Sequence, residues 1–219
     1  MAPVFTASAR RLGMAAATGT TILSAAYAAT LVVGLLSLKS QQQPIGDPLF
    51  AILEILIVLM APFLVALMVA VHAWAPAEAK MFSLIAVVFM SLLAGLTTGV
   101  HFVILALGRQ DAFAKSAWGP LVLSFHWPSV AYALDILAWD GFFALSVLFA
   151  APVFSGSRIA RSIRLMLVAS GVLALGGLSG VFAGDMRLRN IGILGYAVVF
   201  PVAALLMAIL FRRASARDI

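Results

Sequence analysis

The sequence predicts an all-α membrane protein, a polytopic bundle of about six transmembrane helices in one domain covering residues 1–219. Hydrophobic residues make up 64% of the chain and charged residues only 10%, whereas a water-soluble domain spends about a quarter of its residues on charge. The mean hydropathy is +1.14. The apolar residues also gather in runs of the length that crosses the hydrocarbon core as a helix, about 18 residues or more.

Charged and turn-forming residues mark the ends of each run. Arg10 and Arg11 precede the first run, Lys39 closes it, and a polar loop with Pro44 and Pro48 follows. The predicted spans cover residues 12–38, 49–74, 81–107, 128–154, 165–183 and 191–211. The connection before the fourth span is longer. Its part 116–127 is too short to cross, which predicts a segment that lies in the interface or is re-entrant.

The distribution of Lys and Arg predicts the orientation. One end of the predicted bundle carries Arg10, Arg11, Lys80, Arg158, Arg161, Arg164, Arg212, Arg213 and Arg217, and the other carries Lys39, Arg109, Lys115, Arg187 and Arg189. The richer end is expected in the cytoplasm. Both termini then lie inside, as an even number of spans requires.

The first span has an alternative interpretation. Arg10 and Arg11, the apolar stretch and the small residues around Tyr27 are also typical of a cleaved signal peptide. The apolar stretch, however, continues to Leu38, which favours a retained span. Cleavage would leave five helices in the same orientation.

Ionisable residues within the spans indicate a candidate site, because burying them in a membrane is costly. Glu54, His101 and Asp135 fall on three different spans. From the predicted topology, all three lie at a similar depth, about 8–12 Å from the outer face. Asp140 is five residues from Asp135. In a regular α-helix it would therefore point to a different sector, where it could pair with another helix.

Helical spacing groups further polar residues with these three. Thr97, Thr98 and His101 share one face of the third span, and Tyr132, Asp135 and Trp139 share one face of the fourth. We therefore expect an outward-opening polar pocket. The predicted ligand-binding residues are Glu54, Thr98, His101, Tyr132, Asp135 and Trp139.

The chemistry of such a pocket stays open at the level of the sequence. Two carboxylates and an imidazole could bind a cation, relay protons or perform acid–base catalysis, with His101, Glu54 and Asp135 as the candidate catalytic residues. The same three residues are candidate ligands for a divalent metal, although no local motif such as HExxH accompanies them. Alternatively, they are buried pairs that hold the helices together, Asp135 with a tyrosine or an arginine.

Three functions follow from these alternatives. The first is a membrane protein that binds a lipid, a small molecule or an ion in the pocket. The second is a membrane-embedded acid–base or metal-dependent enzyme acting on a lipid or isoprenoid. The third is a non-catalytic subunit of a membrane complex, and a homo-oligomer fits each of them. The glycines Gly176, Gly177 and Gly180 predict close helix contact on the fifth span.

Several cofactors and partners fit the sequence poorly. The absence of cysteine excludes cysteine-ligated iron–sulfur clusters, and the lysines stand at span ends, which argues against a retinal Schiff base. Haem ligation needs two histidines at one depth, but His72, His101 and His126 are predicted at different depths. No basic tract with interleaved aromatic residues indicates nucleic-acid binding. The lipid bilayer is the expected environment.

Two stretches carry a resemblance to known sequences. They are AWDGFFALSVLFAAPVF at 138–154 and GDMRLRNIGILGYAVVFP at 184–201. Both resemble bacterial polytopic membrane proteins of unknown function. The resemblance implies a multi-pass protein of the bacterial inner membrane, and it supplies no activity, cofactor or catalytic residue.

Overall fold

The computed structural model describes residues 5–38, 44–108 and 110–214. In this part of the chain all regular structure is helical, which confirms the all-α class. Six helical stretches are long and apolar enough to cross a membrane, as the sequence predicted. They cover Ala7–Leu36, Leu49–Trp74, Ala77–Leu107, Val130–Val153, Arg158–Ala183 and Asn190–Arg213. Lys39, Arg109 and Arg217, which contributed to the predicted boundaries and orientation, lie outside the described residues.

The first three long helices are nearly uninterrupted, and the last three are composite. The first three comprise α1 (Ala7–Leu36), α2 (Leu49–Trp74), and α3 (Lys80–Leu107) with the short 3-10 turn η1 (Ala77–Ala79) before it. The fourth long helix joins α6 (Val130–Ile136), η2 (Leu137–Phe143), α7 (Ala144–Ala150) and η3 (Ala151–Val153). The fifth joins α8 (Arg158–Gly177) and α9 (Ser179–Ala183), and the sixth joins α10 (Asn190–Ile193), η4 (Leu194–Val199) and α11 (Phe200–Arg213). The segments η2 and η4 are π-helical.

Two helices begin well before the predicted spans. The helix α1 begins at Ala7 rather than residue 12, and α8 begins at Arg158 rather than residue 165. In each case a hydroxyl caps the start: Thr6 Oγ1 accepts from the Ala9 amide at 3.2 Å and Ser157 Oγ from the Ala160 amide at 3.2 Å. The arginines therefore belong to the first two turns of these helices, where long side chains can reach past the apolar region.

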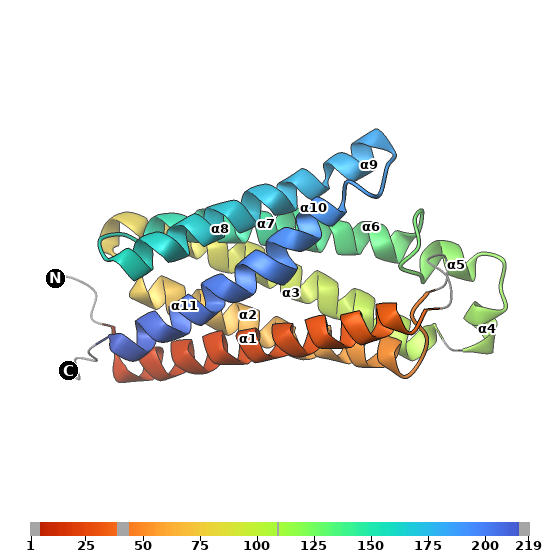
Figure 1. Ribbon diagram of the computed structural model, residues 1–219, viewed down its shortest axis with the longest axis horizontal. Coiled ribbons are helices and arrows are strands. Elements are labelled where there is room, and N and C mark those ends of the chain that lie inside the picture. The colour runs from red at the N-terminus through yellow and green to blue at the C-terminus, as the bar shows by residue number, and fades with distance from the viewer. Residues whose placement is uncertain (1–4, 39–43, 109, 215–219) are drawn as a thin grey trace.

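The six long helices form a closed ring in chain order (Figure 1). Each packs against the next, and α11 returns to pack against α1. The two described ends of the chain meet, since the rings of Phe5 and Phe211 stack at 5.5 Å and Arg10 Nη1 donates to the Ala214 carbonyl at 3.2 Å. Both ends thus lie at one end of the bundle, which is called the terminal end below.

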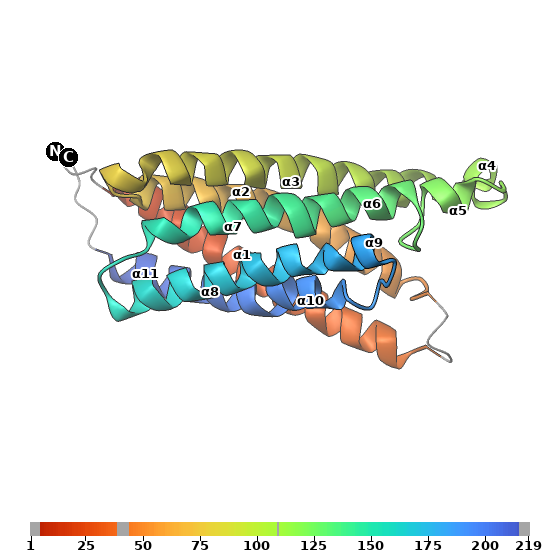
Figure 2. The same cartoon turned by 90° about the horizontal axis from the view of Figure 1, so that it is seen from above.

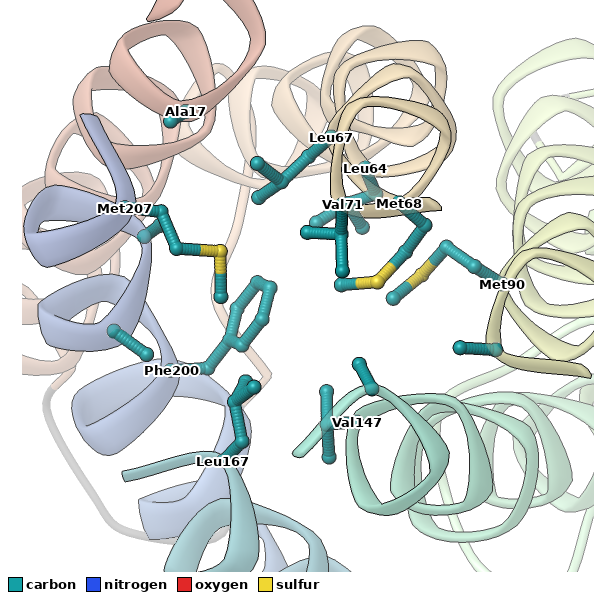
Figure 3. Packing of buried hydrophobic residues seen from close by; sticks show 14 of the residues in the cluster. Ala17, Leu64, Leu67, Met68, Val71, Met90, Val147, Leu167, Phe200 and Met207 are labelled. Atoms are coloured by element: carbon teal, nitrogen blue, oxygen red, sulfur yellow. The ribbon is translucent and has the colours of Figure 1, made fainter. Parts of the chain in front are cut away.

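The interior of the ring is filled by apolar side chains in the middle and toward the terminal end. Figure 3 shows side chains from α1, α2, α3, α7, α8 and α11 converging there. The labelled members, all nearly or fully buried, are Ala17, Leu64, Leu67, Met68, Val71, Met90, Val147, Leu167, Phe200 and Met207. This packing fills the interior of the bundle on the side of the terminal end.

Glycines let the fifth and sixth helices approach closely. A Cβ on Gly177 would lie 3.0 Å from the Gly192 Cα, and one on Gly180 would lie 2.9 Å from the Arg189 nitrogen. At Gly176 a Cβ would meet only ordinary van der Waals distances, 3.5 Å at the nearest. The predicted close contact is confirmed at Gly177 and Gly180.

The connection before the fourth helix carries two short helices, α4 (Asp111–Ala114) and α5 (Gly119–Val122). They lie beyond the ends of the long helices, at the end opposite the terminal end (Figures 1 and 2). Trp118 and Leu121 in this connection are exposed. The segment 116–127, predicted to be interfacial or re-entrant, falls in this connection.

Candidate functional site

A cavity of about 370 Å³ lies in the half of the bundle away from the terminal end. It is bounded by α1, α2, α3, the fourth helix and the sixth helix. Many of the lining side chains are aromatic: Tyr27, Phe50, Phe125, Tyr132, Trp139, Tyr196 and Phe200. Aliphatic residues of α2 and α1 complete the apolar walls, and one wall carries ionisable groups.

The cavity brings together five of the six predicted site residues: Glu54, His101, Tyr132, Asp135 and Trp139. The sixth residue, Thr98, is half-buried and is not part of the lining.

Thr97, the neighbour of Thr98, is instead the buried partner of this site. Its Oγ1 accepts a hydrogen bond from Trp139 Nε1 at 3.1 Å. Thr97 lies one full helical turn from His101, so both side chains point to the same interior.

His101 stands between two carboxyl groups. Its Nδ1 lies 2.7 Å from Glu54 Oε2, and its Nε2 lies 3.4 Å from Asp135 Oδ1. The second pair is within ion-pair distance but lacks hydrogen-bond geometry. The ring of Phe125 lies 5.0 Å from the imidazole. Glu54, His101 and Asp135 expose only 3, 2 and 8% of their surfaces. Three residues far apart in the sequence therefore form one buried polar group.

Arg189 joins this group from the start of the sixth helix. Its Nη2 donates to Asp135 Oδ2 at 3.0 Å, its Nε to Asp140 Oδ2 at 3.3 Å and its Nη1 to the Tyr132 hydroxyl at 3.0 Å. Arg189 is only 5% exposed. The sequence interpretation placed it in a polar turn and counted it as an orientation signal. Its proximity to Asn190 and Asp185 concealed its role, although pairing of Asp135 with a tyrosine or an arginine was one of the alternatives.

The predicted orientation of Asp140 is wrong. Asp135 and Asp140 were expected in different sectors, but both carboxylates reach Arg189. The reason is the π-helical segment η2, which contains Asp140. A π turn closes its hydrogen bonds between residues i and i+5 rather than i+4, so residues five apart approach one face. The expectation that Asp140 pairs with another helix is confirmed by its contact with Arg189.

The second oxygen of Asp140 lies in a niche made by two glycines. Asp140 Oδ1 is buried without a hydrogen-bond partner among the described residues. A Cβ on Gly177 would lie 3.0 Å from it, and one on Gly192 only 2.4 Å. These glycines therefore make room for the carboxyl group as well as for the helix contact.

The charges of the site are nearly balanced and are paired with each other. The chain of contacts runs from Glu54 through His101 and Asp135 to Arg189 and Asp140, and it links α2, α3, the fourth helix and the start of the sixth. Three carboxyl groups face one guanidinium and one imidazole. Buried charges are tolerated only when they are paired in this way. The network therefore also ties the helices together, as the structural alternative expected.

The residues predicted as metal ligands contact each other. Both ring nitrogens of His101 face carboxylates. Within residues 5–38, 44–108 and 110–214, no group of three or more His, Asp or Glu side chains is arranged to hold a metal ion. The geometry of Glu54, His101 and Asp135 is that of an ion-paired chain.

Two tyrosines of the cavity were missed. Tyr27 and Tyr196 both line it, and the Tyr196 ring lies 5.2 Å from the ring of Trp139. Each tyrosine stands in an apolar run, so hydropathy gives no reason to select it. His126, which was expected near the surface, is exposed and also contributes to the lining.

Comparison with known proteins assigns no family. No protein-family model matches the chain, and no curated protein or solved structure matches it.

Proposed function

We propose that this protein binds a lipid, or another small molecule with an apolar body and a polar group, in the cavity of its helix bundle. The observation that carries the proposal is the cavity itself, about 370 Å³ in volume, with aromatic and aliphatic walls and one ionisable wall. Ligand sites are typically concave, mostly apolar and equipped with a few placed polar groups. Helix bundles frequently house them between their helices.

Binding fits the geometry better than transport. Leu64 and Phe200 form the inner limit of the cavity, and both also belong to the apolar packing of the bundle interior. Beyond them lie fully buried side chains such as Leu67, Met68 and Met207. A solute or proton passing through the ring would have to cross this packing.

Binding also fits better than acid–base catalysis. A catalytic histidine needs one ring nitrogen within reach of its substrate. In this site Nδ1 of His101 contacts Glu54, and Nε2 is buried and faces Asp135. The imidazole therefore lines the cavity with both of its nitrogens already facing carboxyl groups of the protein, and the metal-dependent variant lacks a ligand set among the described residues.

The proposal includes an orientation. The terminal end carries Arg158, Arg161, Arg164, Arg212 and Arg213 as well as Arg10 and Arg11. The excess of positive residues supports a cytoplasmic terminal end. The cavity would then occupy the outer half of a bacterial inner membrane.

Native mass spectrometry of protein extracted gently from its own membrane tests the proposal. The key variant is Ile57→Trp, which places a large ring in the cavity lining, and its control is Ile55→Trp on the same helix, where the side chain is 48% exposed. The wild-type protein and Ile55→Trp are expected to retain the same molecule, and Ile57→Trp to lose it while staying folded and monodisperse. A wild-type protein with no retained molecule, or full retention by a folded Ile57→Trp variant, would overturn the proposal.

A further inference from the structure

The cavity has a side wall at which two helices diverge. At the terminal end α1 packs against α11, but toward the cavity end the sixth helix packs through η4 and α10 against α8 (Figures 1 and 2). Lining residues come from both edges of this divergence. Tyr27 and Leu31 of α1 stand on one edge, and Ile193 and Ala197 of the sixth helix on the other. All four are half-buried, so the cavity reaches the lipid-facing surface between these helices.

Apolar side chains cover part of the end of the bundle, where the exposed lining residues Pro44 and His126 also lie. Ile45, in the connection before α2, packs onto α1, where a Cβ on Gly34 would lie 2.8 Å from its Cδ1. Phe125, in the connection before the fourth helix, lies 5.0 Å from the ring of His101 and 6.5 Å from that of Phe50. Ile45 and Phe125 therefore obstruct part of the path from the water at this end.

The local backbone also supports an opening at the sixth helix. Pro201 cannot donate the hydrogen bond that the Ala197 carbonyl would receive in a regular α-helix, and its ring would clash with that carbonyl. The π-helical segment η4 lies just before it and contains both Tyr196 and Ala197. This side of the cavity is therefore built from irregular backbone, which a membrane helix tolerates where it lines a cavity.

Two of the polar groups lie on helices across the ring from the gap, whereas Arg189 stands at the start of the sixth helix. His101 belongs to α3 and Asp135 to α6, whereas the gap is flanked by α1 and the sixth helix. A molecule that comes through the gap would meet apolar and aromatic side chains first and the ionisable wall last. This order suits an amphiphile that inserts with its head leading.

The charged residues around the cavity restrict the chemistry of the polar head that a ligand can carry. Arg189, the one guanidinium among the described lining residues, already contacts Asp135, Asp140 and Tyr132. Three carboxyl groups near the cavity leave no uncompensated positive charge for an anion. In contrast, within the described part of the chain the hydroxyls of Tyr27 and Tyr196 make no hydrogen bond to protein, although both line the cavity. Hydroxyls of this kind suit an uncharged head with a carbonyl or hydroxyl group.

We infer that the cavity is filled from the membrane, through the gap between α1 and the sixth helix, by a lipid with an uncharged hydrogen-bonding head. The head lies against the wall of Glu54, His101 and Asp135, and the chain lies between Leu31 and Ala197. This inference rests on the proposed function and adds the class of the ligand and its route.

The ligand class is tested with two probes that share a chain, an isoprenoid alcohol and its monophosphate ester. Purified protein is incubated with each in detergent and binding is followed by native mass spectrometry. The wild-type protein is expected to bind the alcohol at least tenfold more tightly than the phosphate. Equal or tighter binding of the phosphate, or binding of neither probe, would overturn the ligand class. The proposed function is judged separately, by the molecule retained from the native membrane.

The route is tested by narrowing the gap. Ala197→Trp adds a ring at the gap, and Val198→Trp adds the same ring to a neighbouring position whose side chain is 56% exposed. Ala197→Trp is expected to reduce binding of the alcohol at least tenfold, and Val198→Trp to leave it within about twofold. If Ala197→Trp bound the alcohol as the wild-type protein does while Ile57→Trp lost that binding, the binding site would be supported and the proposed route through the gap would be overturned.

A reversible crosslink distinguishes passage of the ligand through the gap from binding of the ligand in the cavity. The chain has no cysteine, so Leu31→Cys combined with Ile193→Cys can be joined specifically by a reducible bismaleimide. Joining the two helices is expected to slow loading of the alcohol at least tenfold, with recovery after reduction. The single variants treated with the same reagent are the control. Loading at the wild-type rate in the joined protein would overturn the route.

Discussion

Arg189 and Asp135 are joined by a buried ion pair of 3.0 Å between residues 54 positions apart. Both side chains are nearly inaccessible, at 7% and 11% exposure. The pair fixes the start of the sixth helix against the fourth, and Asp140 adds a second contact to the same guanidinium. Arg189 is thus the cation on which two buried carboxylates depend.

Replacing Arg189 is expected to destabilise the protein strongly. In Arg189→Leu, Asp135 and Asp140 lose their shared partner, and an uncompensated buried charge costs about 3–5 kcal/mol. Thermal unfolding in detergent should show a large fall in melting temperature. Arg187→Leu is the control, since Arg187 is exposed two residues away.

Asp140→Asn added to Arg189→Leu should restore part of the lost stability, because it removes one of the orphaned charges. A stability of Arg189→Leu equal to that of Arg187→Leu would contradict the role assigned to the ion pair.

Gly192 is expected to tolerate no side chain. A Cβ there would lie 2.4 Å from Asp140 Oδ1, so Gly192→Ala must displace the carboxyl group or separate the helices, at a cost of about 1–3 kcal/mol. Gly176→Ala on the facing helix is the matched control. Its Cβ would meet ordinary contact distances, and we expect a change within about 0.5 kcal/mol. Equal melting temperatures for the two variants would argue against the niche.

Glu54 and His101 are expected to be energetically coupled. Their side chains meet at 2.7 Å in a buried setting, and neighbours of this kind show coupling energies of about 0.5–3 kcal/mol. A double-mutant cycle of Glu54→Gln and His101→Gln, followed by thermal unfolding, measures this quantity. Additive effects of the two substitutions would show that the contact contributes little to stability.

Thr97 is expected to matter where Thr98 does not. Thr97→Val removes the acceptor of the buried Trp139 Nε1 and should cost about 1–3 kcal/mol. Thr98→Val should leave both melting temperature and ligand retention near wild type, because Thr98 is not part of the cavity lining. A larger effect at Thr98 would restore the original sequence prediction.

Cysteine accessibility tests the proposed orientation. Lys115 caps α4 and Arg212 lies in the last turn of α11, two elements whose ends lie at opposite ends of the bundle (Figure 1). Both side chains are exposed, and the cysteine-free chain gives no background. A membrane-impermeant maleimide is expected to label Lys115→Cys on intact cells and Arg212→Cys only after permeabilisation. The reverse pattern would invert the orientation and place the cavity in the inner half.

Much of the fold follows from hydropathy, because each span must be apolar over its whole length. The same rule identified Glu54, His101 and Asp135 as candidate site residues, because an ionisable residue is unusual in an apolar run. Arg189 stands beside the polar turn, where a charge is ordinary, and nothing in the sequence distinguishes a buried arginine there from an exposed one. Tyr27 and Tyr196 were missed because a tyrosine is common in an apolar membrane helix, so hydropathy does not distinguish a cavity-lining tyrosine from any other.

The error at Asp140 has a different origin. The expectation depended on the regular periodicity of an α-helix, and η2 departs from it. For the sixth helix, Pro201 indicates irregular backbone, whereas no proline lies within η2. Helical phase can therefore be extrapolated along this chain only up to the next π turn.

The π turn gives the fourth helix two separately phased halves. Upstream of it, Tyr132 and Asp135 face the cavity. Downstream, α7 packs against α3 and α8 in the apolar interior, and Ser146 Oγ donates to the Ala86 carbonyl at 2.8 Å. A change in the length or twist of η2 would rotate one half against the other. The shape of the cavity can therefore change while the apolar interior toward the terminal end keeps its packing.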